Sequence, residues 1–260
     1  MAIEGDLRYA IERQQLELHY QPIIDMTNEQ LVGFEALLRW RHPDRGLIAP
    51  DHFIPIAEEA GLIVSIGSWV LSEVCIQLAR WPDELRVAAN LSALQIAPEL
   101  VPEVETYLHR HRIAPSRLVL EITERLVVDP AVEPVVSNLR ALGVSLALDD
   151  FGSGYSSLGS LQRFPFDVLK LDRSLIGSLG QTNGPAIVRA AVELGHALGV
   201  NVIAEGIESH AQLAMLRDFH CPLGQGYLFA RPLAIADAQR LIVALPGSAP
   251  RFRARCARSS

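Results

Sequence analysis

The chain has 260 residues, 49% of them hydrophobic, and a formal net charge of −7, so it can bury a sizeable core as one large domain. No apolar run approaches the roughly 20 residues that span a bilayer, and the lack of a clustered basic stripe outside the last residues argues against general nucleic-acid binding. The three cysteines are widely spaced and odd in number, which argues against a disulfide framework or a zinc site and predicts a cytoplasmic protein.

The first two predicted strands, 16–24 and 31–39, are joined by a polar turn of six residues, DMTNEQ. A connection this short cannot hold a crossover helix, so we expect the two strands to be antiparallel. On the second strand, Glu35, Leu37 and Arg39 alternate onto one face. An acid and a base that share one face of an apolar strand are not ordinary core residues.

Residues 41–50 are predicted to form a loop, followed by a helix with Asp51 as its N-cap. Beyond this point strands alternate with helical stretches. Strands are expected at 86–92, 117–123, 144–150, 166–172, 200–205 and 224–229, and helices at 68–81, 131–142, 184–199, 209–219 and 234–245. Eight strands at this chain length predict a TIM-like (β/α)8 barrel with an antiparallel first strand. We expect the barrel domain to cover residues 1–246 and the basic tail 247–260 to be disordered.

The stretch 146–158 reads LALDDFGSGYSSL and places two adjacent carboxylates, Asp149 and Asp150, at the end of an apolar strand. A turn broken by Gly152 and Gly154 follows. Adjacent acids at the mouth of a buried strand repel one another, and a divalent metal ion relieves that repulsion. Aspartates also end strands simply by bonding turn backbone, so this stretch alone leaves both interpretations open.

Polar residues end nearly every predicted strand, and in barrels of this kind the active site lies at the C-terminal strand ends. In chain order they are Glu35 with Arg39, Asn90, Glu121, Asp149 with Asp150, Lys170 with Asp172, Glu205, and Gln225. Carboxylates and one amide oxygen are hard ligands, which suit Mg²⁺ or Mn²⁺ rather than zinc or copper.

Lys170 is the only lysine in the chain. It either forms a salt bridge to Asp172 or a neighbour, or it orients or deprotonates a water, a task that suits a compact ammonium better than a guanidinium. Glu124 follows the strand that ends in Glu121. It either caps the next helix or holds the DDFGSG loop in place, and we expect a similar local part for Glu208.

The sequence resembles the EAL-domain cyclic-di-GMP phosphodiesterases. The motifs are EALLRW at 35–40, YQPI at 20–23, FIPIAEEAG at 53–61, NLS at 90–92, EITE at 121–124, DDFGSGYSSL at 149–158, KLD at 170–172, AEGIE at 204–208 and QGYLF at 225–229. They occur in the order typical of the family and extend over about 7–245. Two mild departures, Ser153 and Ile207, remove no ligand.

The resemblance implies a role for each matching residue. Glu35, Asn90, Glu121 and Asp149 would hold one Mg²⁺ or Mn²⁺ ion, and Asp149 and Asp150 a second, with Glu205 directly or through water. Lys170 would hold the attacking water, so Lys170, Glu35 and Glu205 form the expected catalytic group. Gln21, Leu37, Arg39, Asp172 and Gln225 would bind substrate. The residues expected to couple the loop to a dimer interface are Glu124, Phe151, Gly152, Ser153, Gly154 and Glu208.

The implied activity is two-metal hydrolysis of cyclic di-GMP to linear 5′-pGpG by a homodimer, with a sensor or cyclase domain in a longer parent protein. A different class of function is a non-catalytic cyclic-di-GMP receptor, which would signal by binding alone. Receptor members of the family usually lack part of the metal set, whereas every position is filled here. An unrelated Mg²⁺-dependent barrel enzyme, such as a lyase, would require the ordered motifs to be accidental.

Overall fold

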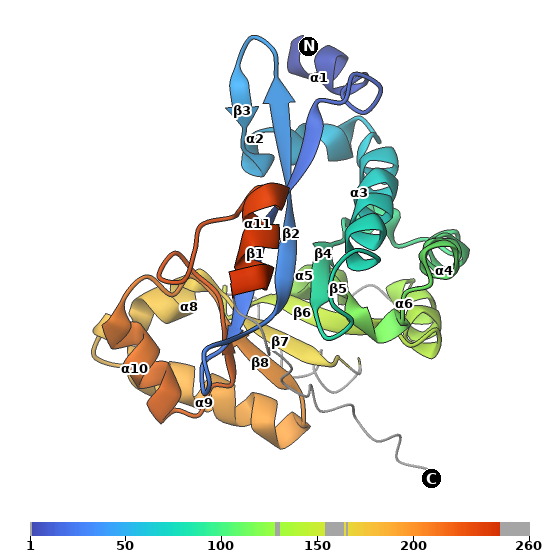
Figure 1. The fold of residues 1–260 in the computed structure, drawn as a ribbon. Helices are drawn as coiled ribbons and strands as arrows, with labels where there is room; N and C mark the ends of the chain where they lie inside the picture. Colours follow the sequence, from blue (N-terminus) through green and yellow to red (C-terminus); the bar gives the residue numbers. More distant parts are fainter. Residues whose placement is uncertain (1, 128–130, 154–163, 165, 245–260) are drawn as a thin grey trace.

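The computed structural model describes residues 2–127, 131–153, 164 and 166–244, and its centre is a closed barrel (Figure 1). Within this part of the chain eight strands form the barrel: β1 (Leu16–Asp25), β2 (Gln30–His42), β4 (Arg86–Asn90), β5 (Leu118–Thr123), β6 (Ser145–Phe151), β7 (Val168–Leu171), β8 (Asn201–Ala204) and β9 (Leu223–Gly224). β1 pairs antiparallel with both β2 and β9, whereas the pairs from β2 through β9 are parallel. The predicted barrel and its antiparallel first strand are confirmed.

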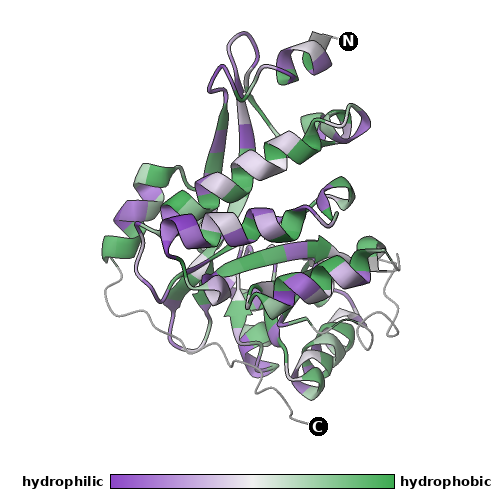
Figure 2. Cartoon of the chain, turned by 90° about the vertical axis from the view of Figure 1, so that its right-hand side faces the viewer, coloured by the Kyte–Doolittle hydropathy of each residue, from purple (hydrophilic) through white to green (hydrophobic). Residues whose placement is uncertain are grey.

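Helices follow most of the parallel strands and cover the outside of the barrel. They are α1 (Ala2–Leu7), α2 (Pro50–Glu59), α3 (Ile63–Leu78), α4 (Leu100–His111), α5 (Glu124–Val127), α6 (Val132–Ala141), α8 (Arg173–Gly177), α9 (Gly184–Leu198), α10 (His210–Asp218) and α11 (Ile235–Ala244). Figure 2 shows hydrophobic and hydrophilic residues alternating along the helices, as expected of helices with one buried face. None of the described helices is both long and apolar enough to cross a membrane.

The core has two layers, one on each side of the barrel wall. The outer layer packs strand residues such as Phe34 and Trp40 against helix residues such as Phe53. The inner layer takes one residue from each barrel strand: Ile23, Val32, Ala88, Val119, Ala147, Val168, Ile203 and Leu223. Because this apolar ring fills the barrel, the interior is a packed core, and the C-terminal strand ends lie above it.

Three local predictions are wrong. Residues 41–50 are not all loop, because β3 (Gly46–Ile48) pairs with the end of β2 and buries Ile48 opposite Trp40. The N-cap of α2 is Ala49 rather than Asp51, since Pro50 takes the first helical position, where its fixed φ and missing N–H are well suited.

The last strand is also shorter than predicted. β9 ends at Gly224, and the chain then turns, with the backbone N–H groups of Phe229 and Ala230 both donating to Gly226 O. A Cβ on Gly226 would lie 2.2 Å from the backbone N and O of Ile207. The close approach of these two loops ends the strand and fixes the path of the chain beyond it.

Candidate active site

A second ring, of polar residues, lies directly above the apolar ring inside the barrel. Side chains two residues apart on a strand point to the same side. On β4 through β9, the residue two positions after the member of the apolar ring therefore also points into the barrel, and these residues are polar. The parallel strands supply Asn90, Glu121, Asp149 and Lys170, and Glu205 and Gln225 follow at the ends of β8 and β9. On antiparallel β1 the same spacing runs backwards, from Ile23 to Gln21, which pairs with Glu35.

Glu35 joins this ring through a β-bulge. Ile23 pairs with Gly33 and Ile24 with Leu31, so Val32 is an extra residue on β2. The bulge lets Val32 enter the apolar ring and still turns Glu35, three residues later, towards the site. Without the extra residue, strict alternation from Val32 would place Glu35 among the helices.

A second bulge accounts for the adjacent aspartates. Leu148 pairs with Leu169 and Phe151 with Leu171, so β6 carries one more residue than β7 between these pairs. Asp150 takes the left-handed backbone conformation, with φ of +59°, and its N–H donates to Asp149 Oδ1 at 2.9 Å. Asp149 is buried while Asp150 is exposed, and both stand at the barrel mouth.

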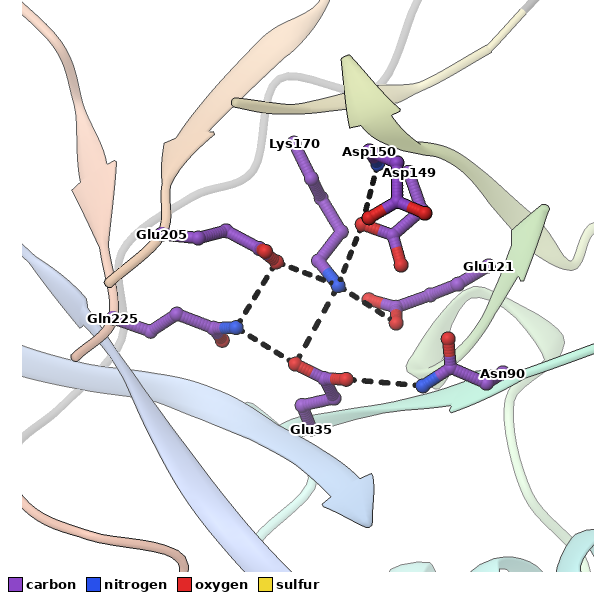
Figure 3. Close-up of polar contacts among 8 residues, drawn as sticks. All are labelled: Glu35, Asn90, Glu121, Asp149, Asp150, Lys170, Glu205 and Gln225. Atoms are coloured by element: carbon purple, nitrogen blue, oxygen red, sulfur yellow. Dashed lines mark hydrogen bonds and ion pairs between the residues drawn. The ribbon is translucent and has the colours of Figure 1, made fainter. Parts of the chain in front are cut away.

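Lys170 is the centre of the site, and its side chain is 1% exposed. Its Nζ lies 2.8 Å from Glu121 Oε2, 2.8 Å from Glu205 Oε1, 3.1 Å from Asp149 Oδ1 and 3.4 Å from Glu35 Oε2. Figure 3 shows the four carboxylates converging on the ammonium from different strands. Lys170 therefore contacts a group of four carboxylates, whereas Asp172 accepts from Ser174 N at 2.9 Å and caps α8.

Two side-chain amides fix the orientation of the Glu35 carboxylate. Asn90 Nδ2 donates to Glu35 Oε1 at 3.0 Å, and Gln225 Nε2 donates to Glu35 Oε2 at 2.7 Å. Gln225 Nε2 also lies 3.1 Å from Glu205 Oε1. Both Glu35 oxygens are thus held, and the network spans β2, β4, β8 and β9.

The site carries more negative charge than one lysine balances. Burial alone would lower the pKa of Lys170, but Asp149, Glu121, Glu205 and Glu35 together raise it well above its ordinary value. Burial and the neighbouring carboxylates raise the pKa of Glu121, and they raise that of Glu205 to about 8 against the pull of Lys170. In the metal-free site the charged form of Lys170 is therefore favoured.

The residues present fit a divalent cation. The donors are hard oxygens, the carboxylates exceed the fixed positive charge, and Glu121 Oε1 is buried with no hydrogen-bond partner in the described part of the chain. Among the described residues no three acidic, histidine or cysteine side chains already surround a common metal position. The physical reason is that Glu35, Glu121 and Asp149 point at the Lys170 ammonium.

Predicted substrate residues lie around this ring. Gln21, Leu37 and Arg39 are partly buried at the mouth, and Arg39 Nη1 donates to Leu38 O at 2.8 Å. Beside them is a cavity of about 460 Å³. Its lining includes Leu37, Pro50, Ile54, Glu58, Asn90, Ser92 and Asp150.

The predicted loop residues are partly placed. Phe151 is buried and ends β6, Gly152 has φ of +94° with Leu175 against it, and Ser153 is exposed. Glu124 is buried at the start of α5, whereas the exposed Glu208 lies in the loop before α10. Gly154 and the tail 247–260 lie outside the described residues. The roles assigned to all these residues stay predictions.

One supporting contact, between two motif residues, was missed by the sequence reasoning. Ser92 Oγ donates to Glu58 Oε1 at 2.6 Å, and Ser92 also accepts from Leu94 N in a capping box with Gln95. This ties α2 to the loop that follows Asn90. The AEEAG segment marked Glu58 as part of a motif, but neither periodicity nor spacing indicated its partner.

The comparisons with known proteins agree with this geometry. The family model described as the EAL domain matches residues 4–232. The chain is 47% identical over 236 residues to the bifunctional diguanylate cyclase/cyclic di-GMP phosphodiesterase MucR of Pseudomonas aeruginosa, covering 88% of this chain and 34% of MucR. It is 42% identical over 251 residues to the cyclic di-GMP phosphodiesterase NbdA of the same organism, covering 93% and 32%.

A solved structure of the MucR phosphodiesterase in complex with c-di-GMP superposes with a TM-score of 0.87 at 45% identity, covering 92% of this chain and 100% of that one. The chain spans about a third of the length of the curated relatives it matches.

Proposed function

Because the chain belongs to the EAL-domain family, we propose that it hydrolyses cyclic di-GMP to linear 5′-pGpG in a reaction that depends on two Mg²⁺ or Mn²⁺ ions. The observation that carries the proposal is the group of four carboxylates around Lys170 at the barrel mouth. The substrate is inferred from MucR and NbdA, both of which are named as cyclic di-GMP phosphodiesterases.

The proposed ligands of the first ion are Glu35, Asn90, Glu121 and Asp149. Those of the second are Asp149 and Asp150, joined by Glu205 directly or through water. When bound, the two ions would supply a water of lowered pKa and positive charge for the phosphate oxygens. The β6 bulge makes the shared role of Asp149 feasible, because it presents two successive carboxylates at the mouth.

Lys170 would orient the attacking water. In the metal-free site the surrounding carboxylates raise its pKa, which favours the ammonium form as a hydrogen-bond donor to that water. Glu35 and Glu205 would lie next to the same water, since both contact Lys170 and Gln225. The water would attack phosphorus in line with the departing 3′-oxygen, and ring opening of the cyclic dinucleotide follows.

Arg39 and the neighbouring cavity would bind the rest of the substrate. Arg39 stands at the rim on the same face of β2 as Glu35, where its charge can meet a phosphate. The cavity combines apolar walls such as Leu37 and Ile54 with the polar groups of Glu58, Asn90 and Ser92, which suits one guanine base. The homodimer and the coupling of the loop 149–154 to its interface belong to the same proposal.

The test is cyclic di-GMP turnover by purified protein with Mg²⁺ or Mn²⁺, with products separated by chromatography. Glu35→Ala should abolish the metal-dependent appearance of pGpG, whereas Glu193→Gln, an exposed change on α9, should not. Binding of cyclic di-GMP without turnover would support the receptor function instead. If the protein neither binds nor hydrolyses cyclic di-GMP, the proposal is refuted.

A further inference from the structure

A large aromatic side chain is exposed beside the proposed site. Tyr227 follows Gln225 by two residues, and 51% of its surface is accessible to solvent. Aromatic side chains with one open surface are the usual platforms on which nucleic-acid bases stack. Exposure alone is common on protein surfaces, so the surroundings of the ring decide its meaning.

The loop that carries Tyr227 is anchored on both sides. The Gln225 side chain bonds Glu35 and Glu205, and Leu228 N donates to Ile207 O at 2.9 Å. Gly226 packs so closely on Ile207 that a Cβ would overlap it. Tyr227 is therefore held between fixed neighbours, and a ligand that packs on the ring need not order the loop first.

One arginine packs on this ring, and a second interacts with it electrostatically. The Arg231 guanidinium carbon lies 4.3 Å from the centre of the Tyr227 ring, within the range of a cation–π contact. Burial lowers the pKa of Arg39, and an electrostatic interaction with Tyr227 opposes that shift. An aromatic surface flanked by cations is suited to a base that carries a phosphate.

The ring and the cavity lie in different parts of the mouth. The cavity is built on β2, β4, α2 and α3, whereas Tyr227 follows β9, and β1 separates β9 from β2 in the sheet. A dinucleotide has two bases, and the cavity accounts for only one of them. A second base needs a surface on the far side of the phosphate that is cleaved.

We propose that Tyr227 is a stacking platform for the second guanine base of cyclic di-GMP, with Arg231 packed on the ring and available to the adjoining phosphate. This inference rests on the proposed function, because it assumes a dinucleotide substrate. It adds a substrate-binding residue and a specificity for an extended dinucleotide with two bases.

The experiment compares Tyr227→Ala and Tyr227→Phe with the wild-type protein in steady-state turnover of cyclic di-GMP with Mg²⁺. Tyr227→Ala should raise KM about tenfold or more and change kcat by less than about twofold, because stacking contributes mainly to binding. Tyr227→Phe keeps the ring and should stay near the wild-type KM. The matched control is Tyr9→Ala, which removes a similarly exposed tyrosine with Arg13 over its ring, in the segment between α1 and β1.

Each outcome bears on a different claim. An unchanged KM in Tyr227→Ala, with an active wild-type enzyme, would overturn this inference and leave the proposed function intact. A fall in kcat for Tyr227→Ala that Tyr227→Phe does not rescue would also overturn it, since the hydroxyl would then matter more than the ring. Absence of turnover in the wild-type protein would overturn the proposed function and this platform together.

Discussion

Replacement of Glu205 by glutamine should stabilise the metal-free protein at neutral and alkaline pH. Burial, together with Asp149 and Glu35, raises the pKa of Glu205 to about 8 from its ordinary value of 4.5, although Lys170 pulls it down. A carboxyl with a raised pKa in the folded state favours folding at low pH. That stability is fully present below pH 4.5 and is lost as pH rises through about 8.

The size of the effect follows from those two values. Each pKa unit corresponds to about 1.4 kcal/mol, so the full loss between pH 4.5 and pH 8 is about 5 kcal/mol, and about 3 kcal/mol of it is reached by pH 7. Glu205→Gln removes this dependence but keeps the Oε1 acceptor that lies 2.8 Å from Lys170 and 3.1 Å from Gln225. The variant should therefore exceed the wild-type protein in free energy of unfolding by a few kcal/mol at pH 8.

The assay is urea unfolding followed by tryptophan fluorescence, in EDTA, at half-unit steps from pH 5 to pH 8.5. The difference between Glu205→Gln and the wild type should grow steadily with pH, while the exposed control Glu193→Gln should track the wild type. Saturating Mg²⁺ should make the wild type the more stable of the two, because the wild type keeps the Glu205 carboxylate as a proposed metal ligand and the variant does not. Parallel pH profiles in EDTA would refute the reasoning.

Three further changes test other parts of the site. Addition of Mg²⁺ to about a hundred times its Kd should stabilise the wild type by about 2.7 kcal/mol in a thermal melt, and Glu121→Ala, which removes a buried carboxylate, should abolish the gain. Asp150→Gly and Asp150→Ala should both lose turnover. In urea unfolding, the glycine variant should have the higher free energy of unfolding, by about 1 kcal/mol, because the backbone at position 150 is left-handed. Gly226→Ala should cost several kcal/mol in the same unfolding assay, because its Cβ meets the Ile207 backbone; an unchanged midpoint would show that the loop can move.

Much of the fold could be predicted because parallel strands follow one rule repeatedly. Each strand buries an apolar residue and then ends in a polar one, so the C-terminal ends marked Asn90, Glu121, Asp149 and Lys170 without knowledge of the packing. The resemblance to the EAL family, now confirmed over residues 4–232, rested on the same segments. Element boundaries were less accurate where a local feature decided them, as Pro50 did at α2.

The environment of Lys170 was beyond the sequence. A single lysine among strand-end acids left open whether it pairs with Asp172, binds another acid or serves as a base. Only the three-dimensional distances show four carboxylates within 3.4 Å of its ammonium, and these carboxylates raise its pKa. The direction of a pKa depends on groups from several strands, and no spacing along one strand reports it.

The two bulges explain why alternation alone does not build this site. A regular strand that supplies Val32 to the barrel interior would direct Phe34 inward and Glu35 outward, and a regular β6 would send Asp149 and Asp150 to opposite faces. One extra residue in β2 and one in β6 correct both at once. Each bulge carries a cost. Position 33 accepts only glycine, because a Cβ there would lie 2.4 Å from Arg86 O, and Asp150 is held in the left-handed conformation. Both costs fall on strands that carry proposed metal ligands, which indicates that the barrel departs from its regular form where the proposed chemistry requires it.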